Sequence, residues 1–154
     1  MVISEARWSK AAIAALLGGL LLHFAIVVVA VGRKGPVQAV LALVAAYALT
    51  LTLIWAFQTV RVRVDGMDLR VGFPIFNKRI PLHDIDRVAP IQYGWFQWGG
   101  WGMRFRRGAV MYNVPGDKGR AVELTLRNGK RVLFSAEDPE AVVTAIRTQQ
   151  ALVP

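Results

Sequence analysis

The stretch AAIAALLGGLLLHFAIVVVAV, residues 11–31, contains 21 consecutive residues without a charged side chain. At a rise of about 1.5 Å per residue, a helix of that length spans the roughly 30 Å hydrocarbon core of a bilayer. A second uncharged stretch covers residues 37–60, and residues 32–36, Gly-Arg-Lys-Gly-Pro, are typical of a turn between two helices. The sequence therefore predicts a hairpin of two transmembrane helices, about 11–31 and 37–59, within residues 1–59.

A cleaved signal peptide is the alternative interpretation of the first uncharged stretch. Val28 and Ala30 provide the small side chains that a signal peptidase prefers before its cleavage point. However, the apolar core of a signal peptide has about 7–15 residues, and its leading segment is basic. The stretch is too long and Glu5 makes the leading segment less basic, so we favour the membrane hairpin.

Charge divides the chain near Val60. The whole sequence is 55% hydrophobic and has a net charge of +9, which is typical of a basic membrane protein. Residues 1–59 contain four basic residues and one acidic residue, whereas residues 60–154 contain fifteen basic and nine acidic residues. Cysteine is absent, which excludes disulfides, thiolate metal sites and cysteine nucleophiles. We therefore expect a separate, basic, cytoplasmic domain over residues 60–154.

Lysine and arginine near the helix ends predict the orientation of the hairpin, because cytoplasmic loops are enriched in them. The basic residues concerned are Arg33 and Lys34 in the turn, and Arg7, Lys10, Arg61 and Arg63 at the opposite ends. The excess at the opposite ends predicts that both termini lie in the cytoplasm. Trp8 and Trp55 would then lie in the cytoplasmic headgroup layer, and we expect both to act as interface anchors.

His23 is the one ionisable residue within the first predicted helix, where lipid offers an imidazole no hydrogen-bond partner. In a hairpin that turns near the middle of the 32–36 segment, His23 lies within one helical turn of Tyr47, so we predict a contact between them. An interhelical hydrogen bond is the ordinary role of such a pair, and a proton or ligand role is the alternative. In the same hairpin Gly18 and Gly19 of the first helix also face the second helix, and their small size is expected to allow a close approach of the two backbones.

Beyond residue 60 the apolar residues recur at every second position, which is typical of strands. Segments with this pattern, or bounded by turn residues, cover 60–64, 67–71, 76–82, 85–91, 101–107, 109–113, 121–126 and 131–134. Asn128 and Gly129, between the last two segments, form the strongest short-range hairpin signal. The sequence therefore predicts about seven antiparallel strands.

The chain ends in a segment with the start signals of a helix. Asp138 is a favourable N-cap, Pro139 suits the first helical position, and Glu140 lies in the first turn. Three apolar residues then share one face, which we expect to be buried. These residues are Val142, Val143 and Ile146. Seven antiparallel strands sealed by one C-terminal helix form the plan of a pleckstrin-homology-like (PH-like) barrel.

Four segments of the chain resemble the bacterial PH-like domains, which often follow one or two transmembrane helices in small membrane proteins. They are VDGMDLRVG (64–72), RIPLHDIDRV (79–88), GGWGMRFRRGAVMYNV (99–114) and AVELTLRNGKRVLFSAEDPEAV (121–142). The resemblance covers about 95 residues and depends on the order of strands and turns. It implies an α+β membrane protein in which a transmembrane hairpin precedes an antiparallel PH-like β-barrel capped by a C-terminal helix. The family contributes no catalytic residue, so the resemblance favours binding, in a multi-pass protein of the bacterial cytoplasmic (inner) membrane.

The segment GWFQWGGWGMRFRRG, residues 94–108, concentrates tryptophan, glycine and arginine. Its glycines disfavour a helix by about 1 kcal/mol each, so we predict a loop that leads into a strand. The tryptophans either fill or cover the barrel, or lie in the headgroup layer with the arginines on lipid phosphates. The candidate lipid or partner contacts are Trp95, Trp98, Trp101, Arg104, Arg106 and Arg107, of which Trp95 and Trp98 are expected to be the most exposed.

Alternation within the strand that follows predicts which of its side chains face the core. Met103 and Phe105 share one face of this strand, and Arg104 and Arg106 share the other. We therefore expect Phe105 to lie in the barrel core.

His83, Asp84 and Asp86 form the one cluster in the sequence that resembles a metal or acid–base site. Neighbouring residues of a strand point to opposite faces, so His83 and Asp84 are not expected to converge without a bulge. Solvated turn residues are the ordinary interpretation of such a cluster. The sequence contains no G-x-S-x-G, phosphate-loop or dinucleotide-binding motif. We therefore expect no catalytic, cofactor or metal site and no enzymatic activity.

The expected function is that of a non-enzymatic, membrane-anchored module that binds or scaffolds a membrane or envelope protein, or that assembles with itself. Recognition of anionic lipid headgroups at the inner leaflet by residues 94–108 is the alternative, and Arg61, Arg63 and Arg70 on a sheet face would meet the same lipids. An enzyme or transporter that uses a histidine is less consistent with the absence of a convergent site. Membrane lipids and an unidentified membrane protein are thus the expected partners, and nucleic acid is not.

Overall fold

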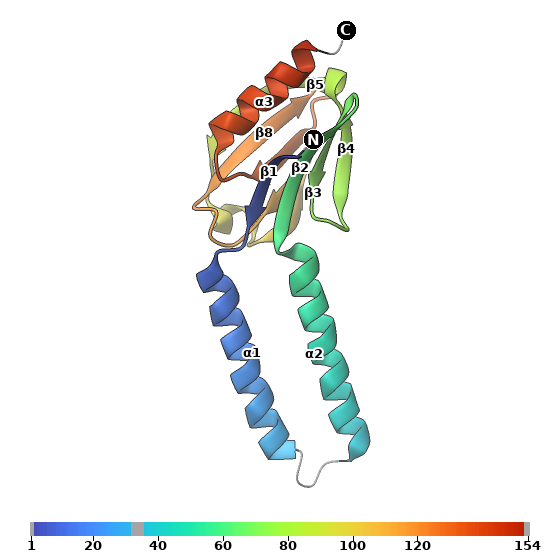
Figure 1. Cartoon of the computed structure of the whole chain (residues 1–154), viewed down its shortest axis with the longest axis vertical. Helices are drawn as coiled ribbons and strands as arrows, with labels where there is room; N and C mark the ends of the chain where they lie inside the picture. Colours follow the sequence, from blue (N-terminus) through green and yellow to red (C-terminus); the bar gives the residue numbers. More distant parts are fainter. Residues whose placement is uncertain (1, 32–35, 153–154) are drawn as a thin grey trace. The chain divides into compact units, whose positions relative to one another are not determined.

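The computed structural model describes residues 2–31 and 36–152, apart from the side chains of Val31 and Trp95. The chain divides into two compact units (Figure 1). The helical unit is Ser9–Ala56, and the β unit consists of Met1–Trp8 together with Phe57–Pro154. Residues 1–8, which the sequence-based prediction grouped with the hairpin, thus belong to the β unit.

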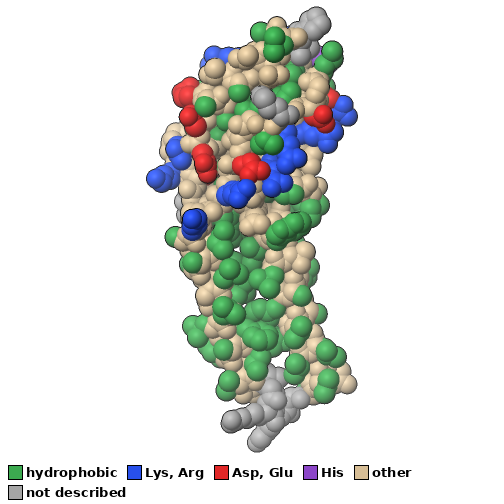
Figure 2. All heavy atoms as spheres, in the orientation of Figure 1, with side chains coloured by type: hydrophobic (Ala, Val, Ile, Leu, Met, Phe, Trp, Pro, Cys, Tyr) green, Lys and Arg blue, Asp and Glu red, His purple; other side chains and the backbone are tan. Residues whose placement is uncertain are grey.

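Two antiparallel helices form the helical unit, α1 (Lys10–Val31) and α2 (Val37–Phe57). Their length and their mean hydropathy, 2.6 and 2.2, are sufficient for each to cross a membrane. Hydrophobic side chains cover the visible face of both helices (Figure 2). Both predicted helices are present, with ends within two residues of the expected ones. The turn that contains Arg33 and Lys34 lies outside the described residues, so its part in the orientation stays a prediction.

Gly18 and Gly19 do not bring the two helices together. A Cβ atom added at either position would meet no heavy atom within 4 Å beyond its own stretch of helix. The predicted close approach of the backbones at these glycines is therefore wrong. Side chains connect the helices instead, because His23 and Phe24 of α1 both contact Tyr47 of α2.

The first sheet of the β unit has four antiparallel strands in the order β1-β2-β3-β4. The strands are β1 (Val2–Arg7), β2 (Thr59–Asp65), β3 (Asp68–Gly72) and β4 (Asn77–Pro81). Strand β1 was not predicted from the sequence. It pairs with β2 although the whole helical unit separates the two strands along the chain, and its Ala6 is 1% exposed.

The second sheet has five strands in the order β5-β8-β9-β7-β6. The strands are β5 (Ile85–Gln92), β6 (Gly102–Arg106), β7 (Ala109–Asn113), β8 (Arg120–Leu126) and β9 (Arg131–Ser135). β7 and β9 run parallel, which corrects the predicted all-antiparallel arrangement. Among the described residues the strands form two separate sheets and not the predicted closed barrel. The 3-10 turn η1 (Leu82–Asp84) carries the chain from the first sheet to the second.

The main core contains side chains from both sheets and from α3 (Pro139–Ala151). Its largest fully buried side chains include Phe73, Phe134, Leu69 and Ile80. The helix begins as predicted, since Asp138 accepts a hydrogen bond from the backbone N–H of Ala141 (3.0 Å) and Pro139 lies in the first turn. The predicted inner face of α3 is also confirmed. Its buried residues are Val142, Val143 and Ile146.

A smaller core lies on the opposite face of the second sheet, because the residues of β7 alternate between the two cores. It consists of Ala109, Met111, Ala121 and Leu133, with Ile91, Tyr93 and Trp98 packed against them. Residues 93–101, which include the 3-10 helix η2 (Trp95–Trp98), therefore cover this face. This covering segment positions the residues of the candidate site.

Candidate binding site

Trp98 and Arg106 hold the covering segment 93–101 on the second sheet. The Arg106 guanidinium lies 4.9 Å from the centre of the Trp98 ring, and Arg106 Nη2 donates a hydrogen bond to the carbonyl oxygen of Gln97. Trp98 is partly buried against the smaller core, so its predicted exposure is wrong. The side chain of Trp95, for which exposure was also predicted, lies outside the described part of the structure.

Asp117 connects the covering segment to the neighbouring strands. Its carboxylate accepts hydrogen bonds from the Tyr93 hydroxyl, from Ser135 Oγ and from the backbone N–H of Gly119 (2.9 Å). Burial, together with the hydrogen bond to Asp117, raises the pKa of Tyr93, so the phenol keeps its proton and remains a donor. The Tyr93 backbone N–H also donates to the carbonyl oxygen of Gly119 (2.9 Å). The start of the segment is thus fixed by both backbone and side chain.

Beside the end of this segment lies a cavity of about 530 Å³, which we name the Arg104 cavity. Its walls consist of Trp8, Phe57, Gly100, Trp101, Gly102, Met103, Arg104 and Pro115. Small-molecule sites are typically apolar clefts of about 300–1,000 Å³ with a few oriented polar groups. The cavity fits that description, since its described walls are largely aromatic and apolar and include one charged side chain.

The Arg104 side chain has a nitrogen without a partner. Its Nε atom is shielded from solvent and has no hydrogen-bond acceptor among the described residues. Gly100 leaves space for the guanidinium, because a Cβ at that position would lie only 3.3 Å from Arg104 Nη2. Asn113 Nδ2 holds Gly100 by donating to its carbonyl oxygen (3.2 Å), while the buried Asn113 Oδ1 has no described partner. Since roughly 90% of buried polar groups are hydrogen-bonded, the unpartnered nitrogen marks Arg104 as the polar group of this cavity whose hydrogen bonds are incomplete.

Trp8 and Phe57 form a wall of the cavity at the two points where the chain enters and leaves the β unit. Trp8 lies two residues before α1, and Phe57 is the last residue of α2. The Trp8 indole N–H donates to the carbonyl oxygen of Phe57 (3.0 Å), and its backbone N–H donates to that of Gln58 (3.0 Å). Trp8, predicted as an interface anchor, is partly buried here, whereas the second predicted anchor, Trp55, is 59% exposed on α2.

The other residues that were predicted to contact a lipid or a partner lie in two different places. Trp101, 41% exposed, lies in the cavity wall with Arg104, whereas Arg107 is exposed in the turn between β6 and β7. Phe105 is 71% exposed, so the prediction that it lies in the core is wrong. Met103, which shares this face of β6, does pack against the main core, whereas Phe105 lies near the end of this outer strand and remains in solvent.

In the helical unit, the predicted contact between His23 and Tyr47 is present. His23 Nδ1 lies at hydrogen-bond distance from the Tyr47 hydroxyl, and the two ring centroids are 6.0 Å apart. Phe24 packs edge-on against Tyr47 with a centroid distance of 4.9 Å. The pair satisfies two polar groups on otherwise apolar helices, which is the ordinary structural role of such a contact.

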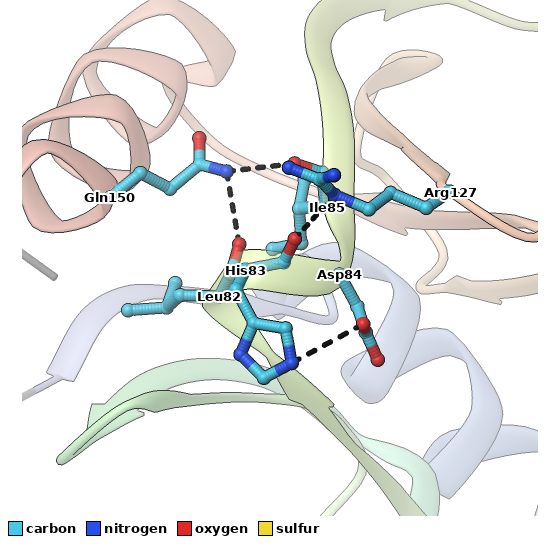
Figure 3. Close-up of polar contacts among 6 residues, drawn as sticks. All are labelled: Leu82, His83, Asp84, Ile85, Arg127 and Gln150. Carbon is cyan, nitrogen blue, oxygen red and sulfur yellow. Dashed lines mark hydrogen bonds and ion pairs between the residues drawn. The ribbon is translucent and has the colours of Figure 1, made fainter. Parts of the chain in front are cut away.

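His83 and Asp84 converge, contrary to the sequence-based prediction. They lie in the η1 turn and not on a strand, and His83 Nε2 is 3.4 Å from Asp84 Oδ1 (Figure 3). Both side chains are mostly solvated, at 68% and 51% exposure. Among residues 2–31 and 36–152, no three His, Cys, Asp or Glu side chains, including Asp86, form a group that could hold a metal ion.

The backbone of the same turn is held by side chains from two other elements. Arg127 Nε donates to the carbonyl oxygen of His83 (2.7 Å), and Gln150 Nε2 donates to those of Leu82 (3.1 Å) and Ile85 (2.9 Å) (Figure 3). Gln150 extends from α3 and Arg127 follows β8. The turn therefore serves as a junction that fixes the end of the C-terminal helix.

No family model, curated protein or solved structure matches the chain. Among the described residues, the Arg104 cavity combines a concave shape, apolar walls and an unsatisfied cationic group. Such a site suits a ligand that has both an apolar part and an acidic group.

Proposed function

We propose that the protein is a non-enzymatic, membrane-anchored binding module that recognises an anionic lipid through the Arg104 cavity. The observation that carries the proposal is an apolar cavity whose one charged side chain, among its described lining residues, is Arg104. An acidic lipid oxygen would pair with the Arg104 guanidinium, and the aromatic walls would pack against the apolar part of the same molecule.

The chain connections explain why a lipid is the favoured ligand. The cavity residues Trp8 and Phe57 adjoin the two helices that are long and apolar enough to cross a membrane. Once both helices are inserted, these residues stay within a few residues of the headgroup layer, where lipid is the most concentrated amphiphile. The basic excess of residues 60–154 favours anionic lipids, by about 1 kcal/mol for each basic residue close to the surface.

The same proposal places the protein in the bacterial cytoplasmic membrane, with both termini in the cytoplasm. The basic residues beside the outer helix ends, together with the basic β unit, support this orientation. A distant relation to the PH-like domains is part of the proposal. It is supported by a C-terminal helix that packs against β5 and β8 and adds its buried face to the main core, with the strands in two sheets instead of one closed barrel.

Replacing Arg104 with glutamine is expected to lower the affinity for phosphatidylglycerol about tenfold, equivalent to about 1.4 kcal/mol. The full chain in dodecyl maltoside micelles is titrated with phosphatidylglycerol or phosphatidylcholine, and bound lipid is counted by native mass spectrometry. The wild type should retain the anionic lipid preferentially, and Arg104→Lys, which keeps the charge, should preserve the preference. Arg107→Gln in the exposed turn is the matched control. Equal binding of both lipids, or equal losses in the two glutamine variants, would rule out the proposal.

A second candidate function is docking of a membrane or envelope protein at the outer strand β6. Within the described residues β6 is the last strand of its sheet, and it carries Phe105, which is 71% exposed. An outer strand can accept a further strand from a partner. Arg106 and Arg107 favour an acidic partner segment over a second copy of this chain, which would oppose arginine to arginine.

A photoreactive phenylalanine analogue at position 105 is expected to cross-link the partner in living cells, because a segment added to β6 would lie against it. The same analogue at Met67, 60% exposed between β2 and β3, is the control. The product should be specific to position 105 and lost when Arg107→Glu reverses the neighbouring charge, as read by immunoblot. Identical products at both positions contradict this second candidate, and a product of twice the chain mass would assign the surface to self-association.

A further inference from the structure

The outer face of the first sheet carries a row of arginines at directly opposed positions. Arg63 of β2 faces Arg70 of β3, and Arg70 faces Arg79 of β4. Figure 2 shows Lys and Arg side chains gathered in a band over these strands. Like charges directly opposite one another destabilise a sheet, so the row is unfavourable for folding by itself.

Acidic neighbours compensate only part of this charge. Arg70 pairs with Asp65 (3.1 Å), and Arg79 Nε donates to Asp68 (2.6 Å). Arg63 has no carboxylate partner among the described residues. A cationic group therefore remains uncompensated at the β2 end of the row.

The nearby Arg61 is partly compensated as well. Arg61 Nε lies 2.7 Å from Glu5 Oε1, but Glu5 also pairs with Arg7 (2.7 Å). One carboxylate thus serves two guanidinium groups at this end of the sheet. The local excess of positive charge extends from Arg63 to Arg61 and is open to solvent, since the side chains of Arg61 and Arg70 are 37% and 47% exposed.

Three of these arginines line a hollow of about 210 Å³. Its walls consist of Arg61, Arg63, Arg70, Gly72, Phe73, Pro74 and Asn77. Gly72 fixes the shape of its floor, because at φ +140° a Cβ there would lie 2.5 Å from the carbonyl oxygen of Phe76. At about 30 Å³ per water molecule, the hollow has room for several waters and so for a tetrahedral oxyanion.

We propose that this hollow is a second binding site, which takes a phosphate group through Arg61, Arg63 and Arg70. Guanidinium groups match the geometry of phosphate oxygens and form charge-assisted, often bidentate, hydrogen bonds with them. A bound phosphate also offsets the repulsion between Arg63 and Arg70. No residue of the described part of the chain lines both this hollow and the Arg104 cavity, so the site stands independently of the proposed lipid recognition. The phosphate group belongs either to a lipid headgroup or to a soluble phosphorylated molecule.

The test uses the full chain in neutral maltoside micelles, with inorganic phosphate as the probe and sodium chloride at matched ionic strength as the reference. Phosphate is expected to raise the midpoint of thermal unfolding saturably, and Arg63→Gln should lower its apparent affinity about tenfold. Without phosphate, Arg63→Gln should unfold at an equal or higher temperature than the wild type at low salt, because the substitution removes repulsion with Arg70. This result would show that Arg63→Gln removes the phosphate site without destabilising the fold.

Two matched variants and a lipid arm complete the test. Arg87→Gln on the exposed side of β5 and Lys118→Gln in the loop before β8 should both keep the response to phosphate. In a parallel arm, the full chain is placed in phosphatidylcholine nanodiscs with or without phosphatidic acid. A response that depends on Arg63 in the nanodisc arm alone assigns the hollow to lipid headgroups, and a response to inorganic phosphate assigns it to soluble phosphate as well. No response beyond chloride in either arm, or equal losses in Arg63→Gln and Arg87→Gln, would overturn the proposal.

Discussion

Gly119→Ala is expected to destabilise the β unit by about 4 kcal/mol, because the new methyl group has no space and the backbone conformation disfavours it. Gly119 has φ +72°, and a Cβ there would lie 2.3 Å from the backbone carbonyl oxygen of Tyr93. Relief of that clash requires the two segments to separate, which breaks the 2.9 Å hydrogen bond from Tyr93 N–H to the Gly119 carbonyl oxygen. Thermal unfolding of the full chain in maltoside micelles, followed by tryptophan fluorescence, should show a midpoint lower by roughly 15–30 °C.

Gly108→Ala is the matched control for this prediction. Gly108 has the same φ of +72°, but a Cβ at this position meets nothing within 4 Å. Its substitution should therefore cost only the left-handed conformation, about 1 kcal/mol. Equal midpoints for the two alanine variants would show that the chain does not approach Tyr93 closely at Gly119.

The approach at Gly119 also determines whether the covering segment 93–101 can form. Gln92 Nε2 donates to the carbonyl oxygen of Lys118 (2.8 Å), and Asp117 binds the Tyr93 hydroxyl. All of these contacts join the start of the segment to the loop before β8. The end of the same segment supplies Gly100 and Trp101 to the Arg104 cavity, so disruption at Gly119 should also disturb the cavity.

The parts of the fold that the sequence predicts well are those whose signals are local. The two apolar helices follow from uninterrupted hydrophobic stretches, and the start of α3 follows from Asp138 and Pro139. Asn128 and Gly129 correctly place the turn between β8 and β9. Each of these features depends on residues that are neighbours in the chain.

The parts that the sequence does not predict depend on distant pairing. β1 has a short and weakly alternating sequence, and only its pairing with β2, beyond the helical unit, makes it a strand. The parallel pairing of β7 with β9 likewise joins strands separated by β8. The predicted strands 76–82 and 85–91 leave His83 and Asp84 between them, but only the structure shows that η1 joins two different sheets and brings these two side chains together.

Only part of the candidate site could be predicted from the sequence, because the other part also depends on residues that are distant in the chain. Trp101 and Arg104 stand out in the sequence because they lie in one glycine-rich segment. Trp8 and Phe57 complete the cavity wall, but Trp8 precedes the helical unit and Phe57 directly follows it, so both are far from Arg104 in sequence and no local pattern could assign them to the site. Trp98 was placed at the surface because neither the smaller core nor its stacking with Arg106 is visible from spacing alone.

Phe134→Ala is expected to cost about 3–5 kcal/mol of the free energy of unfolding, because it removes a phenyl ring from the main core and leaves a cavity. Phe134 is 0% exposed and lies on β9 between Tyr112 of β7 and Val122 of β8. Urea unfolding of the full chain in maltoside micelles, followed by near-UV circular dichroism, measures the loss.

Phe105→Ala is the same chemical change at a position that alternation predicts to be equally buried. Phe105 is 71% exposed at the outer strand β6, so its substitution should change the free energy of unfolding by no more than about 0.5 kcal/mol. Similar losses at the two positions would mean that Phe105 is packed in a core and that β6 is not an outer strand. A large loss at Phe134 alone would show that the β9 side chain fills the space between the sheets and that the Phe105 ring on β6 contributes nothing to that core.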